Sequence, residues 1–402
     1  MKLVSLEQVR QAAGTIEEVA LVTPFERSRV LSEYAGGPVY LKCENLQRTG
    51  AFKIRGAYNR IARLPEQERA RGVVCASAGN HAQGVALAAT LLDVKATVFM
   101  PEGAALPKIE ATERYGAEVR LGGAVYDEAF ESAEKFAADT GAVMVHPFDH
   151  PDVIAGQGTV ALEIVDRLPE VKTIVVPVGG GGLISGIAAA AKGLLPNVRI
   201  VGVEPKGAAE VSAALSAGHP VSLPSLSTIA DGLAAKQTGE ITFAHLRELV
   251  DDVVQVSDDE IAQALLLMLE RAKLVVEPSG AAGVAAIMQG LEVEPPTVVV
   301  LSGGNIDPLL LLKVIRFGMG SVGRYFWFRT RVPDHPGELH RLLGVIADAG
   351  ANIIGIEHHR EGVRLRHLGE VEVAVQVETR GTEHVSELKK SLTSAGYEIE
   401  KP

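Results

Sequence analysis

One lysine stands in a setting that could make it a chemical reagent. The stretch TGAFKIRGAYN, from Thr49 to Asn59, places Lys53 between Phe52 and Ile54, shortly after a glycine. An amine flanked by apolar side chains has its charged form disfavoured by desolvation, so its pKa falls and it becomes nucleophilic. The alternative is an ordinary lysine on the solvated side of a helix. The choice between the two depends on what the rest of the chain brings to this amine.

Four glycine-rich segments at the ends of expected strands could form the surroundings of this lysine. They read RTGAFKIRGA, CASAGNHAQGVA, VVPVGGGGLISGIA and VVVLSGGNID, and the last three each run from a strand through small residues into a helix. In open α/β sheets, ligands bind at the carboxyl ends of strands, beside helix N-termini. Four such ends could therefore build one site.

The run Gly179–Gly182 is the strongest sign of an anion site. Four consecutive glycines let the backbone wrap closely around a group, and their N–H groups precede a helix N-terminus that favours phosphate. The run is not a P-loop, because no Gly-Lys-Ser/Thr follows, and its spacing differs from GxGxxG. A tight packing turn is the alternative. A phosphate site together with a lysine in apolar surroundings predicts pyridoxal phosphate as the cofactor.

The elements that must position these segments follow a strand–helix alternation. Helical apolar spacing covers Asn80–Leu92 and Val125–Thr140. Nearly all-apolar strands that alternate with helices are typical of an α/β fold with parallel sheets covered on both faces. The strands are expected at 38–43, 72–77, 96–100, 117–121, 142–146, 173–178, 198–204 and 297–303.

The pattern changes after about Ser321. From there, RYFWFRTRVPDHPGELHRLLGVIADAGANIIGIEHHR predicts a strand, a turn, a helix and a strand. HLGEVEVAVQVET adds an alternating strand, EHVSELKKSLTSAG a helix and YEIEK a last strand, which gives βαββαβ with an antiparallel sheet. The glycine-rich RFGMGSVGR is the expected linker. We therefore expect two domains, residues 1–320 and 321–402.

Composition limits the possible partners. The chain has 402 residues and a formal net charge of −11, which disfavours nucleic acid and anionic membranes. No apolar run reaches the roughly 18 residues of a membrane span. The only cysteines are Cys43 and Cys75, so no disulfide framework is expected and the cytoplasm is the expected compartment.

The motifs TGAFKIRGA, SAGNHAQG, VGGGGL, VEP and LSGGN together resemble the fold-type II pyridoxal-phosphate enzymes. Within that group they resemble the threonine dehydratases (threonine ammonia-lyases), relatives of serine dehydratase and serine racemase. The resemblance covers residues 5–320, and the tail around VPDHPGEL resembles a regulatory ACT domain. It implies two open, twisted, mostly parallel sheets, followed by the ACT-like domain. The large subdomain would comprise about 1–49 and 148–320, and the small one about 50–147.

The resemblance also implies the roles of individual residues. Lys53 matches the lysine that forms a Schiff base with the cofactor and later moves the Cα proton. Phe52 matches the residue packed near the ring, Asn80 the partner of the phenolic oxygen, and Ser302 the partner of the pyridine nitrogen. Two loops complete the match: Gly179, Gly180, Gly181, Gly182 and Leu183 for the phosphate, and Ser77, Ala78, Gly79, Asn80 and His81 for the substrate carboxylate.

The reaction that this resemblance implies is β-elimination of L-threonine to 2-oxobutanoate and ammonia, with L-serine to pyruvate as a lesser activity. A neutral Ser302 gives a moderate electron sink, which favours prompt elimination. Ala78 stands where the racemases carry serine, and a methyl group cannot transfer a proton. A serine dehydratase or racemase, and a non-catalytic amino-acid sensor, remain as alternatives.

Two further expectations come from the same resemblance. Glu204, the Ala208 carbonyl and Glu210 match the ligands of a structural cation, whose oxygen donors suit Mg²⁺, Ca²⁺ or K⁺. Two acids at a solvated helix start are the alternative. The ACT-like domain is expected to bind isoleucine, with valine as counter-effector, or to serve only as a pairing module. A homodimer or homotetramer is expected.

Ala51 departs from the family pattern, because relatives usually carry serine there. A serine hydroxyl could cap the helix that carries the lysine or contact the cofactor phosphate, and the loss of a cap would cost about 1 kcal/mol. Thr49 is the expected substitute cap.

Overall fold

The computed structural model describes residues 2–359 and 369–400. The chain forms two compact units, Met1–Asp307 and Pro308–Pro402, each with its own hydrophobic core. Within the described ranges, no helix has the length and apolar character needed to cross a membrane.

The larger sheet of the first unit has six strands in the order β1-β2-β10-β7-β8-β9. All neighbours run parallel except β1 and β2, as the sequence predicts for a mostly parallel sheet. Two strands were not expected from the sequence: β1, a three-residue edge strand, and β9, an edge strand that is half exposed. The strands are β1 (Phe25–Arg27), β2 (Val39–Lys42), β7 (Thr173–Pro177), β8 (Arg199–Pro205), β9 (Asp252–Val256) and β10 (Thr297–Val300).

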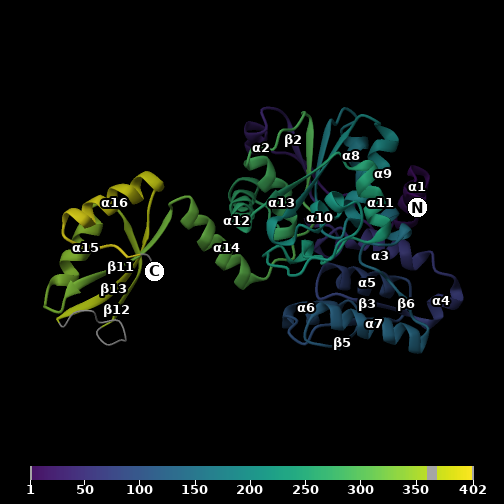
Figure 1. The fold of residues 1–402 in the computed structure, drawn as a ribbon, viewed down its shortest axis with the longest axis horizontal. Helices are drawn as coiled ribbons and strands as arrows, with labels where there is room; N and C mark the ends of the chain where they lie inside the picture. The colour runs from purple at the N-terminus through teal and green to yellow at the C-terminus, as the bar shows by residue number, and fades with distance from the viewer. Residues whose placement is uncertain (1, 360–368, 401–402) are drawn as a thin grey trace. The chain divides into compact units, whose positions relative to one another are not determined.

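Helices cover both faces of this sheet. Helix α13 (Pro278–Met288) packs on one face, and α9 (Gly182–Leu194) with α8 (Pro151–Arg167) lies on the other (Figure 1). The helices α8 and α9 approach each other closely through Gly158 and Gly186, where an added Cβ would meet backbone atoms of the facing helix at 2.7 and 2.2 Å. This close packing fixes the position of the N-terminus of α9.

The smaller sheet has four parallel strands in the order β5-β4-β3-β6. Alternate residues of its central strands face two separate apolar clusters, one shared with α5 (Asn80–Leu91) and the other with α7 (Tyr126–Thr140). Helix α3 (Lys53–Ala62) packs against both α5 and α8 and so joins the two layers. The strands are β3 (Val73–Ala76), β4 (Ala96–Met100), β5 (Glu118–Leu121) and β6 (Val143–Met144).

The remaining helices of the first unit surround these two layers. They are α1 (Leu6–Ile16), α2 (Arg29–Tyr34), α4 (Glu66–Arg71), α6 (Leu106–Arg114), α10 (Glu210–Ala217), α11 (Glu240–Leu249) and α12 (Asp258–Leu267).

The second unit is a three-stranded antiparallel sheet with two helices on it. The order is β11-β13-β12, with β11 (Tyr325–Pro333), β12 (Asn352–His359), β13 (Glu370–Glu378), α15 (Glu338–Asp348) and α16 (Thr382–Ser394). Two expectations were wrong here. The glycine-rich linker is mostly helical, because α14 (Pro308–Ser321) runs through Gly318 and Gly320, and YEIEK is no strand within the described residues.

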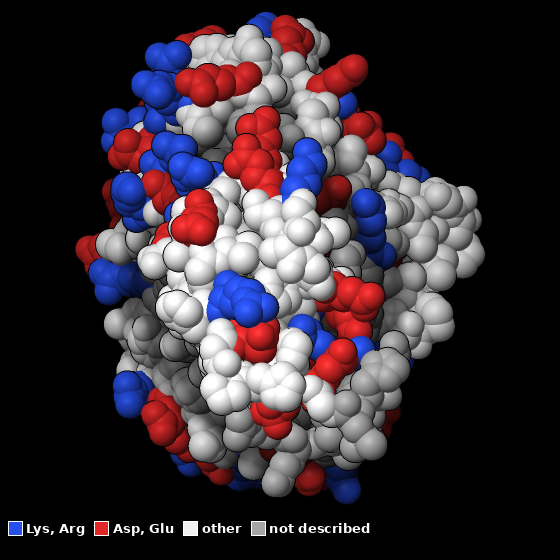
Figure 2. All heavy atoms as spheres, turned by 90° about the vertical axis from the view of Figure 1, so that its left-hand side faces the viewer, with Lys and Arg blue, Asp and Glu red and all other residues white. Residues whose placement is uncertain are grey.

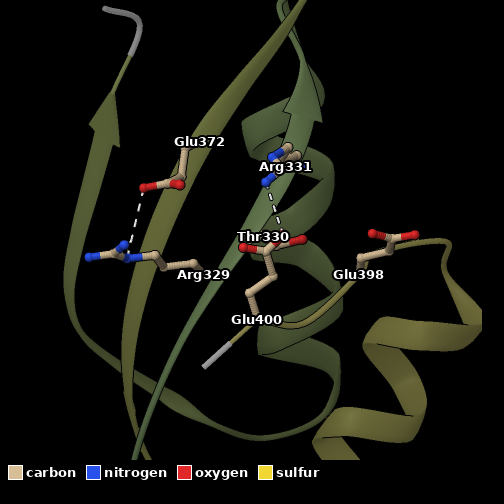
Figure 3. Close-up of a pocket in the computed structure, with 6 residues that line it drawn as sticks. All are labelled: Arg329, Thr330, Arg331, Glu372, Glu398 and Glu400. Carbon is tan, nitrogen blue, oxygen red and sulfur yellow. Dashed lines mark hydrogen bonds and ion pairs between the residues drawn. The ribbon is translucent and has the colours of Figure 1, made fainter. Parts of the chain in front are cut away.

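The segment expected as the last strand contributes only a bridge between Arg329 and Glu400. One ion pair, Arg331–Glu400, reinforces it, and a second joins β11 to β13. Arg331 contacts Glu400 at 2.9 Å and Arg329 contacts Glu372 at 3.8 Å, around a small polar pocket beside β11 (Figure 3). The C-terminal segment is therefore attached to the outer edge of β11 by two backbone hydrogen bonds between Arg329 and Glu400, at 3.0 and 2.9 Å, and by the Arg331–Glu400 ion pair, while Lys401 lies outside the described residues.

Charged side chains of both signs are mixed on one face of the molecule. On the face drawn in Figure 2, acidic and basic residues are interspersed, and no broad area carries lysine and arginine alone.

Candidate active site

Lys53 is the first residue of α3, and the loop before it lies against the end of β10. The Phe52 N–H donates to the Ser302 carbonyl at 3.2 Å, and Ala51 forms an isolated bridge with Gly303. The preceding turn needs left-handed backbone at Thr49 (φ 61°) and Gly50 (φ 70°). Two segments 250 residues apart thus bring the lysine next to the expected serine.

The Lys53 amine is half-buried, and its Nζ donates to the Pro147 carbonyl at 2.8 Å. Burial lowers its pKa from 10.5 to about 8, and the opposing charge of Glu277 limits the fall. Desolvation therefore acts in the direction that the sequence predicts. The capping expectation was wrong, because the cap position of α3 is Phe52, and buried Thr49 Oγ1 has no partner within the described residues.

The expected carboxylate loop, 77–81, joins β3 to α5. Ser77 Oγ accepts from the Gly79 N–H at 3.1 Å, and α5 begins at Asn80. His81 is buried, and its Nε2–H donates to the Val145 carbonyl at 2.8 Å. Burial lowers the pKa of His81 to about 3, and nearby Lys53 adds to this shift. The imidazole is therefore neutral, and its Nε2–H is already used by the Val145 carbonyl, as is typical of a packing residue rather than a base.

Gly179–Gly182 follow β7 and lead into α9, as expected. No glycine of the run has room for a side chain: an added Cβ would lie 2.9 Å from Leu233 at Gly179, 2.3 Å from the Phe148 ring at Gly180 and 2.8 Å from Phe148 at Gly182. Gly181 has φ 90°. The run is thus a close-packed turn, and it also presents the first N–H groups of α9, which have no acceptor within the helix. The two interpretations of the run are compatible.

Four residues that the sequence analysis did not assign also belong to this site. Pro147 and Phe148 connect the lysine to the glycine run through the contacts above. Glu277 Oε1 accepts from Asn80 Nδ2 at 2.7 Å, and Asn305 Nδ2 donates to Asn80 Oδ1 at 2.9 Å. The sequence does contain a signal for Glu277 and Asn305. Asn305 ends the motif LSGGN, and Glu277 precedes the helix start PSGAAG.

Glu204 and Glu210 form a separate pair at the end of β8 and the start of α10. Glu204 accepts from the N–H groups of Val211 and Ser212 at 3.0 and 3.2 Å. Both Glu210 oxygens are buried and lack a hydrogen-bond partner in the described part of the chain. Burial raises the pKa of Glu210 to about 9, and Glu204 adds to the shift. Across the same residues, no group of three or more acids, histidines and cysteines is arranged for a metal.

The residues around Lys53 fit pyridoxal phosphate chemically. The amine has a lowered pKa, Ser302 is buried at the end of β10, and the N-termini of α5 and α9 offer unused N–H groups to anions. Ser279 Oγ is buried beside Gly232 and has no partner among the described residues. Such an orphaned hydroxyl is expected where a polar ligand completes a site.

Comparison with known proteins identifies the class. Residues 16–304 match the family described as pyridoxal-phosphate dependent enzyme, and residues 326–393 match the ACT domain. The chain belongs to the pyridoxal-phosphate dependent enzymes and carries a C-terminal ACT domain.

Individual relatives narrow the comparison. The chain is 46% identical to the L-threonine ammonia-lyase of Thermotoga maritima, over 99% of both chains. Its structure resembles threonine deaminase isoform 2 of Solanum lycopersicum, with 39% identity, a TM-score of 0.74, and coverage of 80% of this chain and 95% of that one. Maize serine racemase has the same TM-score at 38% identity, over 80% of this chain and 99% of that one. The resemblance to threonine ammonia-lyases is confirmed, while the fold alone does not separate lyase from racemase.

Proposed function

We propose that this enzyme converts L-threonine to 2-oxobutanoate and ammonia, and L-serine to pyruvate and ammonia more slowly. The water lost in the elimination is regained when the product hydrolyses, so the atoms balance. One observation carries the proposal. A half-buried lysine with a lowered pKa begins α3, in a chain similar over its whole length to an L-threonine ammonia-lyase.

The proposal gives each part of the site a task. Bound pyridoxal phosphate would supply an electron-withdrawing ring that acidifies the Cα hydrogen of the amino acid. Lys53 would hold the cofactor through its amine, and the same Nζ is the base that takes the Cα proton. The start of α9 would bind the phosphate, and residues 77–81 at the start of α5 would bind the substrate carboxylate. Phe52 would pack near the ring, and Ser302 would meet its nitrogen without supplying a charge.

The test is steady-state release of 2-oxo acid from threonine and serine. We expect the purified protein to be yellow, and Lys53→Ala to lose both the visible absorption of the bound cofactor and the activity while it stays folded. Unchanged absorption in that variant would refute the role of Lys53. Because Ala78 offers no proton donor, we expect no D-serine from L-serine, and measurable D-serine would instead favour the racemase alternative. A protein that binds amino acids but releases no oxo acid would be the sensor alternative.

We also propose a cation between Glu204, the Ala208 carbonyl and Glu210, supported by the orphaned carboxyl of Glu210. Without a cation, a raised Glu210 pKa gives stability at low pH that is lost as pH rises through about 9. We expect Mg²⁺, Ca²⁺ or K⁺ at constant ionic strength to raise the unfolding midpoint at pH 9, and Glu210→Gln to abolish that response. An equal response in both proteins would refute the site.

Regulation through the ACT domain is the third part of the proposal. The sequence DHPGEL forms a turn that leads into α15, with Gly337 as N-cap at φ 97°, which supports a carboxylate seat. The only tryptophan, Trp327, lies in β11 of the same unit. We expect isoleucine to change its fluorescence and to lower activity in the full-length dimer or tetramer, with valine opposing it. If no amino acid changes either signal, the module serves only for pairing.

A further inference from the structure

A row of hydrogen bonds crosses the site from the loop before the lysine to the start of α13. Asn305 Nδ2 donates to the Thr49 carbonyl at 2.6 Å and to Asn80 Oδ1 at 2.9 Å. Asn80 Nδ2 in turn donates to Glu277 Oε1 at 2.7 Å. Four segments that are distant in the sequence thus meet in a row in which every bond has a defined direction.

The Thr49 carbonyl sets that direction. A backbone carbonyl can only accept, so the amide edge of Asn305 that faces it must be the NH₂ group. Its two hydrogens are then used on Thr49 and on Asn80. Asn80 must therefore turn its oxygen toward Asn305 and its nitrogen to the other side, because a reversed amide would place two NH₂ groups against each other.

Glu277 supports this orientation but cannot impose it alone. Burial, followed by the charge of Asp231, raises the pKa of Glu277 to about 7. Near neutral pH the carboxyl is therefore partly protonated, and a protonated carboxyl can donate to an amide oxygen as well as accept from an amide nitrogen. The Asn305 backbone N–H also donates to this carboxyl. Asn305 therefore contacts Asn80 through its side chain and Glu277 through its backbone N–H, and of the two partners of the Asn80 amide only the Asn305 side chain has a fixed polarity.

We propose that Asn305, with Glu277, is a positioning residue that locks the Asn80 amide so that one hydrogen on its nitrogen remains for the cofactor. The amide nitrogen carries two hydrogens, and Glu277 takes one of them. The other is the donor that Asn80 has available. This inference rests on the proposed function, because pyridoxal phosphate is the group that Asn80 is proposed to contact.

The arrangement also connects the amide to the lysine. Thr49 has the left-handed φ of 61° and lies four residues before Lys53 in the same loop. There is no spare space at the centre of the row, because a Cβ at Gly303 would lie 2.2 Å from Glu277 Oε1 and 3.1 Å from Asn80 Nδ2. One backbone turn therefore fixes both the start of the lysine helix and the direction of the Asn80 amide.

The test compares two Asn→Leu substitutions in the full-length holoenzyme. Asn305→Leu keeps the approximate shape and removes the polar row. Asn45→Leu is the matched control, because Asn45 Nδ2 donates to the Val275 carbonyl at 3.0 Å and supports the same segment without touching Asn80. The readouts are the dissociation constant of added pyridoxal phosphate, the ratio of its visible absorption bands when bound, kcat and KM separately, and the unfolding midpoint.

We expect Asn305→Leu to weaken pyridoxal phosphate binding about tenfold, the effect of one lost oriented hydrogen bond, and to change the band ratio. Asn305→Asp should weaken pyridoxal phosphate binding further. A carboxylate cannot donate to the Thr49 carbonyl, and it would accept from the Asn80 amide nitrogen, which reverses the orientation of that amide. Asn45→Leu should lower the unfolding midpoint by a similar amount, with a wild-type band ratio and an affinity within about twofold of wild type.

Two results would overturn the inference. If Asn305→Leu binds the cofactor with wild-type affinity and band ratio, Asn305 does not position Asn80, although the proposed function stands. If Asn45→Leu changes the band ratio as much as Asn305→Leu does, the effect is general loosening of the site. A wild-type protein that takes up no pyridoxal phosphate would refute the proposed function and this inference together.

Discussion

A buried charge cluster beneath the lysine helix offers the sharpest test of what holds the site together. Arg55, two residues after Lys53, is 1% exposed and directs all five of its N–H groups to acceptors. It forms a two-point ion pair with fully buried Glu44, at 2.8 and 2.9 Å, and contacts Glu163 at 2.6 Å. Lys42 also contacts Glu163, so two cations balance two acids.

Arg55→Leu would leave two acids, fully buried Glu44 and partly buried Glu163, with one cation. Among the described residues, Glu44 would then keep only the Thr23 hydroxyl as a side-chain donor, at 2.6 Å. Breaking a buried ion pair by removing one partner costs about 3–5 kcal/mol, because the remaining charge is buried without compensation. Adding Glu44→Gln restores the balance between Lys42 and Glu163, so the double variant should be more stable than Arg55→Leu alone.

The sign of the pH dependence gives a second criterion. In the wild type, Arg55 and neighbouring charges hold the Glu44 pKa below its usual value, against the effect of burial. That contribution is present above the unfolded pKa and is lost as pH falls. In Arg55→Leu, burial is no longer opposed by the guanidinium, and a raised Glu44 pKa makes stability increase as pH falls from about 7 to about 5.

The assay is urea unfolding followed by far-UV circular dichroism at both pH values. Trp327 fluorescence reports on the second unit and serves as an internal control that should not change. A loss below about 1 kcal/mol for Arg55→Leu, or strictly additive effects in the double variant, would refute the reasoning.

Three further predictions concern packing, charge and pH. Gly186→Ala should destabilise the first unit by about 1–3 kcal/mol, since its Cβ would lie 2.2 Å from a backbone carbonyl of α8. Gly14→Ala, with no atom within 4 Å in α1, should instead stabilise by about 0.5–1 kcal/mol, and thermal unfolding of both variants compares the signs. Asp231→Asn removes the exposed ion pair with Lys108, at 2.6 Å, and should cost no more than about 1 kcal/mol at low salt. The difference should vanish in high salt, and a salt-independent loss would contradict it. The rate at which apoprotein takes up pyridoxal phosphate should rise with pH around a midpoint of about 8, as Lys53 loses its proton, and a midpoint at the ordinary value of 10.5 would exclude a desolvated amine.

The sequence predicts the elements well where local pattern and long-range packing require the same residues. The central strands β3 and β7 are continuous apolar runs because both faces of a parallel sheet are covered, so the pattern is visible without the fold. The pattern is weaker at sheet edges, which explains why β1 and β9 were missed. It misled at Gly318 and Gly320, where α14 continues although glycine disfavours helix.

The chemistry of the site likewise has one part that the sequence determines and one part that depends on the tertiary structure. The sequence by itself determined the class of chemistry, because the lysine, the glycine run and LSGGN are each recognisable as short contiguous motifs. It did not determine how Asn80 is oriented. That depends on Glu277, Asn305 and the Thr49 carbonyl, which lie 197, 225 and 31 positions from Asn80 and meet only after both sheets have formed. Hydrogen-bond direction is a property of groups in contact, so only the tertiary structure could decide it.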